Sequence, residues 1–208
     1  MLNLKNELKL KFGIFDKFWD NQPNHLPLLN LRVDLSETET FNLGKSLKLI
    51  DEIISENQID DIYNDTRKML TELNWRLHLV AFITILKLDK SEQQKYIGFL
   101  WKRLCLGTWV SPQLLVTLSK IDFNFKEKAE LILKEVGLNK FRTNYLSEKE
   151  LAERNFNYEL TDNKILNSLR YLKNEKILTD IDDDNGAKIA QNWNEQLTKL
   201  NKLDLIKN

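Results

Sequence analysis

Hydrophobic residues recur at helical spacing along most of the 208-residue chain. From residue 43 onward, apolar side chains return every three or four positions, a spacing that lines one face of an α-helix. The pattern predicts about nine helices joined by short connections. They span about residues 36–54, 59–73, 75–88, 91–106, 111–121, 124–136, 161–172 and 190–200, and one more begins at Ser147.

Polar residues near the predicted helix ends are of types that satisfy free backbone groups. Three pairs match the capping box, in which a Ser side chain and a Glu or Gln side chain bond the first amides of a helix. They are Ser36–Glu39, Ser91–Gln94 and Ser147–Glu150. We expect Ser111 and Pro112 to open another helix, with Ser111 as its cap. Gly107 and Gly137 are expected to end the helices that precede them.

The first 35 residues have a different pattern. Apolar and polar residues alternate there with period two, as in β-strands. The alternating sets are Leu8, Leu10, Phe12 and Ile14, and then Leu29, Leu31, Val33 and Leu35. We therefore predict an N-terminal arm over residues 1–35 that holds two short strands. A short helix over residues 3–20 is the alternative.

The scarcity of turn-forming residues favours an all-α fold. The chain contains six Gly and three Pro, which is few for a sandwich or barrel. Short connections make sequential helices antiparallel neighbours. Because no linker rich in Gly, Pro or Ser divides the helices, we expect one α-helical domain over residues 36–208, built from antiparallel helix pairs.

Tryptophan-containing segments connect this pattern to a known family. Trp75 and Trp109 each open a Leu-rich helix, and their offset of about 34 residues is the length of one helix-pair repeat; chance similarity between Leu-rich helices is the alternative. The segments WRLHLVA at 75–81, LW at 100–101 and TWVSPQL at 108–114 resemble the helix pairs of HEAT-like bacterial proteins. Some of those proteins are immunity proteins paired with toxins. The resemblance, over residues 75–136, implies a HEAT-like array and no catalytic residue.

Charge and hydropathy indicate the compartment. The chain has 31 basic and 31 acidic side chains, so it has no strong general attraction to nucleic acid or anionic membranes. The apolar stretch at 77–88 is shorter than the roughly 20 residues that a membrane span needs. Charged residues interrupt the N-terminal segment before it reaches the apolar length of a secretory signal. We expect a cytoplasmic protein that does not bind membranes.

Chemical motifs are weak. Cys105 lies among leucines and is expected to be a buried hydrophobic residue. His78 is expected to be a hydrogen-bonded core residue. The acidic segment 180–186 resembles a calcium loop, but position twelve is Gln191 instead of Glu, so a helix-capping acidic loop is preferred. We expect no cofactor.

Residues 87–104 hold five basic side chains, but their aromatic residues overlap the core stripe, so nucleic-acid binding is not favoured.

The clearest charge feature is acidic. Residues 34–65 contain nine acidic and two basic side chains. The candidate partner-binding carboxylates are Asp51, Glu52, Glu56, Asp60, Asp61 and Asp65. Either they form a docking surface for a basic partner, or they are an ordinary solvated face. Trp19, together with Phe15 and Phe18, is a second candidate. Exposed, these rings would be hot spots for binding; buried, they would tie the arm to the domain.

These observations predict a non-enzymatic, intracellular protein-binding module. Its most concrete form is an immunity-type protein that neutralises a basic toxin through an acidic helical face. A small enzyme with a cleft between helices and a nucleic-acid-associated regulator are the alternatives.

Overall fold

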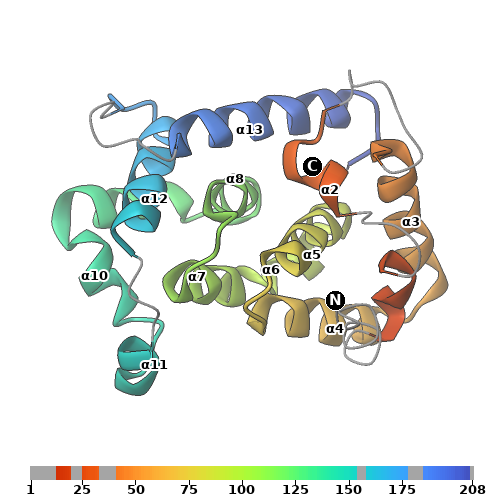
Figure 1. Ribbon diagram of the computed structural model, residues 1–208, viewed down its shortest axis with the longest axis horizontal. Coiled ribbons are helices and arrows are strands. Elements are labelled where there is room, and N and C mark those ends of the chain that lie inside the picture. The colour runs from red at the N-terminus through yellow and green to blue at the C-terminus, as the bar shows by residue number, and fades with distance from the viewer. Residues whose placement is uncertain (1–12, 20–24, 33–40, 154–157, 178–184, 207–208) are drawn as a thin grey trace, which may run out of the picture. The chain divides into compact units, whose positions relative to one another are not determined.

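The structure is a computed structural model that describes residues 13–19, 25–32, 41–153, 158–177 and 185–206 (Figure 1). Within these ranges the regular structure is helical and contains no strand. The prediction of an all-α fold is therefore confirmed for the described part of the chain. No helix found in these ranges is both long enough and apolar enough to cross a bilayer.

The chain divides into two compact units. The first comprises residues 1–89 and 196–208, and the second comprises residues 90–195. The boundary near the C-terminus lies within α13 (Gly186–Lys202). The described part of the N-terminal arm therefore belongs to the same unit as the helices that follow it directly.

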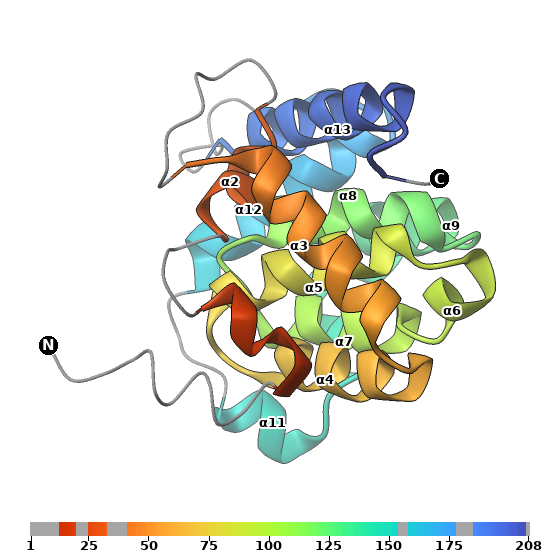
Figure 2. The same cartoon turned by 90° about the vertical axis from the view of Figure 1, so that its right-hand side faces the viewer.

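In the first unit, one apolar helix is surrounded by its neighbours. The elements are η1 (Gly13–Phe18), α2 (Leu26–Asn30), α3 (Leu43–Glu56), α4 (Ile59–Thr71) and α5 (Trp75–Lys87). All residues of α5 from Leu77 to Leu86 are buried, and α5 packs against α2, α3 and α4. A helix that is apolar on every side has to be covered in this way. Figure 2 shows η1 beside α3 and α4, and it packs on both.

A side-chain cap and a buried histidine hold α5 in the first unit. The Asn74 side chain accepts the backbone N–H of Arg76 at 3.1 Å and caps α5. His78 is buried, and its Nε2 lies 2.8 Å from the carbonyl oxygen of Glu72, the residue that ends α4. The predicted role of His78 as a hydrogen-bonded core residue is confirmed.

In the second unit, α8 (Ser111–Ile121) is the central helix. It packs against α6 (Lys90–Gln94), α7 (Ile97–Leu106), α9 (Phe125–Glu130) and α12 (Tyr158–Leu172). Figure 1 shows α8 nearly end-on between α7 and α12. The remaining elements are the π-helix η2 (Leu131–Glu135), α10 (Gly137–Arg142), α11 (Glu148–Glu153) and the first part of α13.

Helix ends agree with the sequence in some places and not in others. The Ser147–Glu150 capping box is confirmed, because the Ser147 amide donates to the Glu150 carboxylate at 2.9 Å and the Glu150 amide donates to Ser147 Oγ at 3.3 Å. The Ser91–Gln94 box is wrong, because the pair lies inside α6 and Gln94 donates instead to the carbonyl of Ile121. The Ser36–Glu39 pair lies outside the described residues.

The start of α8 differs from the prediction in one detail. Ser111 is the first helical residue instead of the cap, and its buried Oγ has no hydrogen-bond partner among the described residues. Gly107 ends α7 with φ = 95°, as predicted. Gly137, with φ = 71°, separates η2 from α10. Both angles lie in the region that glycine adopts without a steric penalty.

Neither predicted strand forms where the structure describes the chain. Ile14 lies in η1, Leu29 lies in α2, and Leu31 is the C-cap of α2 with φ = 50°. Pro27 explains α2, because its fixed φ favours the first turn of a helix. The other alternating residues up to Phe12, and those from Val33 onward, lie outside the described residues.

Candidate functional site

Four of the predicted carboxylates lie where α3 ends and α4 begins, and we call them the acidic junction. Glu52 and Glu56 lie on the last two turns of α3, and Asp60 and Asp61 lie on the first turn of α4. Asn57 and Gln58 connect the two helices. The four residue steps from Glu56 to Asp60 can span at most about 14 Å, so the junction concentrates negative charge in a short stretch of surface.

The helix dipoles distinguish the two halves of the acidic junction. The positive N-terminal end of α4 stabilises Asp60 and Asp61. Glu52 and Glu56 lie near the negative C-terminal end of α3, which has no basic residue in its last turn. A carboxylate there is disfavoured by the dipole. Within α3, Glu52 gains the (i,i+4) ion pair with Lys48, whereas the helix itself provides no reason for Glu56, in its last turn, to be acidic.

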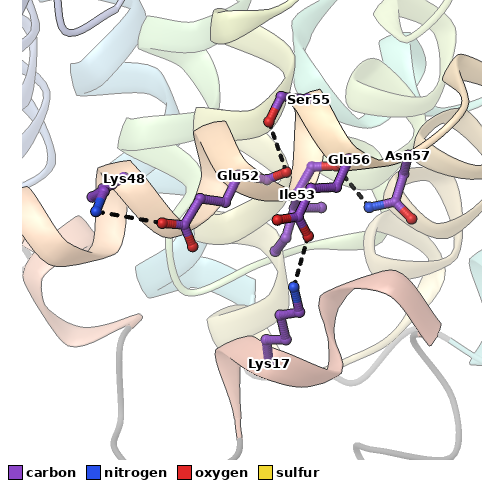
Figure 3. A network of polar contacts seen from close by, with 7 residues as sticks. All are labelled: Lys17, Lys48, Glu52, Ile53, Ser55, Glu56 and Asn57. Atoms are coloured by element: carbon purple, nitrogen blue, oxygen red, sulfur yellow. Dashed lines mark hydrogen bonds and ion pairs between the residues drawn. The ribbon is translucent and has the colours of Figure 1, made fainter.

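Two lysines compensate part of this charge (Figure 3). Lys17 Nζ of η1 lies 2.8 Å from Glu56 Oε2, and Lys48 Nζ lies 3.6 Å from Glu52 Oε1. The hydrogen bond from Lys17 to Glu56, with the negative charge of Glu56, raises the pKa of Lys17 above its ordinary value. Asp60 and Asp61 are exposed and form no ion pair with a described residue. The junction thus keeps carboxylates that are accessible to an external cation.

The other two predicted carboxylates have structural roles. Asp51 Oδ1 accepts Lys87 Nζ at 2.7 Å, and the same ammonium group donates to the carbonyl of Leu205. Asp65 is buried, accepts the backbone N–H of Ile14 and pairs with Lys68. The structure therefore does not bring Asp51 and Asp65 into the acidic junction, and we leave both out of the proposed surface.

Trp19 is buried, with 6% of its surface exposed. Its ring contacts Phe18 edge-on at 5.8 Å between centroids and His25 at 5.5 Å. Phe15 and Phe18 are fully buried. These rings anchor the described part of the arm to the first unit, which is the structural alternative, so Trp19 is also left out of the proposed surface.

Most basic side chains of the segment 87–104 are already in ion pairs or buried. Lys95 pairs with Glu92, Lys102 pairs with Glu150, and Arg103 is buried with a hydrogen bond to the carbonyl of Gly107. Tyr96 and Trp101 are fully buried. Tyr96 and Trp101 therefore belong to the core, as the sequence indicated, while Phe99 is half-buried.

A buried polar network in the second unit is absent from the sequence predictions. Asp122 Oδ2 accepts Trp101 Nε1 at 2.7 Å and Lys128 Nζ at 2.8 Å, and its Oδ1 accepts the amide of Asn124 at 2.9 Å. Burial acts to raise the pKa of Asp122, but these hydrogen bonds outweigh burial and lower it below its ordinary value. A saturated, ionised carboxylate of this kind positions helices and is not suited to act as a general acid.

Tyr145 and Cys105 are two further titratable groups in the second unit. Burial, with the charges of Cys105 and Asp122, raises the pKa of Tyr145 to about 12, so its hydroxyl stays protonated. Cys105 is fully buried, which agrees with its predicted role as a hydrophobic residue. Among the described residues, no three His, Cys, Asp or Glu side chains come together as a metal site would require. Of the acidic segment 180–186, residues 180–184 lie outside the described part of the chain.

No protein-family model, curated protein or solved structure matches the chain. The similarity of residues 75–136 to HEAT-like immunity proteins therefore stays a prediction.

Proposed function

We propose that the chain is a non-enzymatic protein-binding module whose acidic junction docks a basic protein. The main support is the position of Glu56 in the last turn of α3, at its negative end, where the helix gains no stability from a carboxylate. Beside it lie Asp60 and Asp61 of α4, which are exposed and form no ion pair with a described residue. Selection for a negative surface accounts for a carboxylate that local stability does not favour.

The contact between Lys17 and Glu56 shows how a cation is held there. The ammonium group reaches the carboxylate from a neighbouring element at 2.8 Å, while both side chains stay 56% exposed. A partner's lysine or arginine can approach Glu52, Asp60 and Asp61 in the same manner. Such complementary charges raise the association rate and fix the orientation of the complex more than they raise affinity.

The most concrete form of this proposal is an immunity-type protein that neutralises a basic toxin. The basic active-site cleft of a toxin is blocked effectively by a rigid acidic surface. The adjoining ends of α3 and α4 provide such a surface. The similarity of residues 75–136 to helix pairs of HEAT-like proteins agrees with this role.

The experiment compares two triple variants for binding to the products of neighbouring genes. E52Q/D60N/D61N removes three charges from the acidic junction and leaves the Lys17–Glu56 ion pair intact. E153Q/E127Q/E148Q is the matched control. Glu153 pairs with Lys149 at the same (i,i+4) spacing as Glu52 with Lys48, and Glu127 and Glu148 lie in first helical turns, as Asp60 and Asp61 do.

We expect a neighbouring gene product to bind the native chain, with an association rate that falls as ionic strength rises. The junction variant should weaken binding about tenfold or more, and the control should change it less than threefold. Absence of any binding partner, or equal binding by both variants, would refute the proposal.

A further inference from the structure

Three aromatic rings converge where α2 and α5 begin in the first unit. The His25 ring lies between the indoles of Trp19 and Trp75, with ring centroids 5.5 Å and 6.0 Å away. His25 directly precedes α2, Trp75 is the first residue of α5, and α2 packs on α5. The arrangement is therefore held by packed elements of one unit.

Two polar atoms in this cluster have no hydrogen-bond partner among the residues that the structure describes. They are Trp19 Nε1 and His25 Nδ1, both buried, and each residue is only 6% exposed. Buried polar groups nearly always have a partner, so each exception needs an explanation. Here an unused N–H donor and an unused imidazole nitrogen belong to neighbouring rings.

Arg76 adds a positive charge at the same place. Its guanidinium carbon lies 4.7 Å over the Trp75 ring, its side chain is exposed, and it forms no ion pair with a described residue. The first turn of α5 contains no acidic residue, although a helix N-terminus favours anions. Stacking on Trp75 orients the planar guanidinium, which suits it to bind an oxyanion through two parallel hydrogen bonds.

We propose that Trp19, His25 and Arg76 form a binding site for an oxyanion, a phosphate or carboxylate group, with Trp75 as the platform that orients Arg76. Arg76 donates to the anion from its guanidinium. Trp19 donates from Nε1, and His25 takes up a proton from solvent and donates from the ring nitrogen that is unpaired in the free protein. The anion thereby satisfies both buried atoms and neutralises the charge on Arg76.

The charges around His25 make this proton uptake measurable. Burial, and then the positive charge of Arg76, lower the pKa of His25 to about 4. The α2 helix has no titratable residue. On η1 and α3, which lie nearby, Asp16 has contacts of its own, while Lys17, Lys48 and Asp51 are in ion pairs. A bound anion removes the repulsion from Arg76 and so raises the pKa of His25.

The experiment follows the His25 ring by NMR in the full chain. The chain has two histidines, so one His25→Gln variant assigns both ring signals. The pKa of His25 is measured in chloride, in sulfate and in acetate at constant ionic strength. Sulfate stays dianionic over this range and stands for phosphate, and acetate stands for a carboxylate. We expect the oxyanion that binds at this site to raise the pKa of His25 by about one unit or more, which is a tenfold change in its affinity for the proton.

Matched arginine variants test the site. Arg76→Met should abolish the rise, and Arg76→Lys should keep only part of it, because lysine does not form the paired hydrogen bonds. Arg67, whose guanidinium carbon lies 5.8 Å over the Tyr63 ring, is the control, and Arg67→Met should leave the rise intact. A rise in sulfate alone assigns a phosphate site, and a rise in acetate alone assigns a carboxylate site. No rise in either anion, or equal loss in both Met variants, would overturn the proposal.

Discussion

The carboxylate of Asp65 accepts the backbone N–H of Ile14, a residue 51 positions earlier in the chain, at 3.2 Å. This bond fixes the first turn of η1 on α4. Gly13 precedes it with φ = 42°, and a Cβ added there would come within 2.7 Å of Asp65 Oδ2. A residue that looks like part of an acidic block in the sequence therefore serves as the anchor of the N-terminal segment.

Replacing Asp65 by Ala should destabilise the first unit by about 1–3 kcal/mol, because a buried amide and Lys68 lose their acceptor. Asp65→Asn keeps one acceptor oxygen and should lose less. Chemical denaturation followed by tryptophan fluorescence measures both. Asp61→Ala, an exposed acid of the same helix, is the control and should cost less than about 1 kcal/mol, the contribution of the helix dipole.

An independent check of the Asp65 anchor uses Gly13. Gly13→Ala should destabilise the chain by about 1 kcal/mol or more, because alanine resists the positive φ and its Cβ displaces the carboxylate. If both Asp65→Ala and Gly13→Ala matched the native stability, η1 would not be held on α4 by this carboxylate.

His25 should make the folded chain sensitive to acid. Its pKa in the folded state is about 4, below the ordinary value of 6.5, so the unfolded chain binds the proton more readily. The stabilisation is fully present above pH 6.5 and decreases as the pH falls from 6.5 toward 4. The loss should reach about 2–3 kcal/mol.

The comparison for this prediction is His25→Phe, which keeps a ring between Trp19 and Trp75 but cannot titrate. Its free energy of unfolding, measured in chloride buffers, should vary less between pH 7 and pH 4.5 than that of the native chain. Identical pH profiles for the two proteins would show that His25 is not the titrating group.

Removing the Asp122 carboxylate should destabilise the second unit. Asp122→Asn loses the charge that Lys128 and the Trp101 N–H share, and we expect a cost of about 1–3 kcal/mol. Because the pKa of Asp122 is lowered, its stabilisation is present above the ordinary pKa of a carboxyl and is lost as the pH falls through the lowered value.

A double-mutant cycle with Trp101→Phe isolates the Trp101–Asp122 hydrogen bond. Phe keeps most of the ring that contacts Phe125 and Phe141. The coupling energy should be about 1 kcal/mol or more. Additive effects of the two substitutions would mean that the bond does not stabilise the fold.

Local patterns account for much of the helical structure. The stripe of apolar residues predicted α4 and α5 almost at their observed ends, since a helix face and its cap depend on residues three or four apart. Asn74, Gly107 and the Ser147–Glu150 box are such local features.

The predicted start of α3 at Ser36 is wrong, because α3 begins at Leu43 with Asn42 as its cap. The predicted 124–136 helix is continuous over 125–135, but its change from α-helix (α9) to π-helix (η2) at Leu131 was not predicted, because the sequence there is still apolar at helical spacing.

The acidic block shows why the site could be predicted only in part. Along the chain, residues 34–65 look strongly negative, yet Lys17 and Lys87 reach Glu56 and Asp51 from 39 and 36 positions away. Charge balance in space depends on such long-range pairs, which periodicity does not reveal. Burial of Asp65 and Trp19 likewise depends on how the arm packs. What remains accessible is the smaller acidic junction.

Two glycines provide a prediction about backbone contact. A Cβ on Gly186, at the start of α13, would lie 2.4 Å from the carbonyl oxygen of Lys164 and 2.7 Å from its Cα. Both are backbone atoms of α12, so neither can move aside without shifting the helix. Ser168 Oγ also donates to the carbonyl of Gly186 at 3.0 Å. Gly186 therefore permits the close approach of α13 to α12.

Gly186→Ala should cost about 1–3 kcal/mol or more, the range for overpacking. Gly98, on the exposed side of α7, has no atom within 4 Å of an added Cβ. Gly98→Ala should instead stabilise the chain by about 0.5–1 kcal/mol, because alanine loses less entropy in a helix. Thermal denaturation of both variants measures the difference. Equal effects of the two substitutions would mean that α12 and α13 do not meet at Gly186, because only that contact distinguishes the two sites.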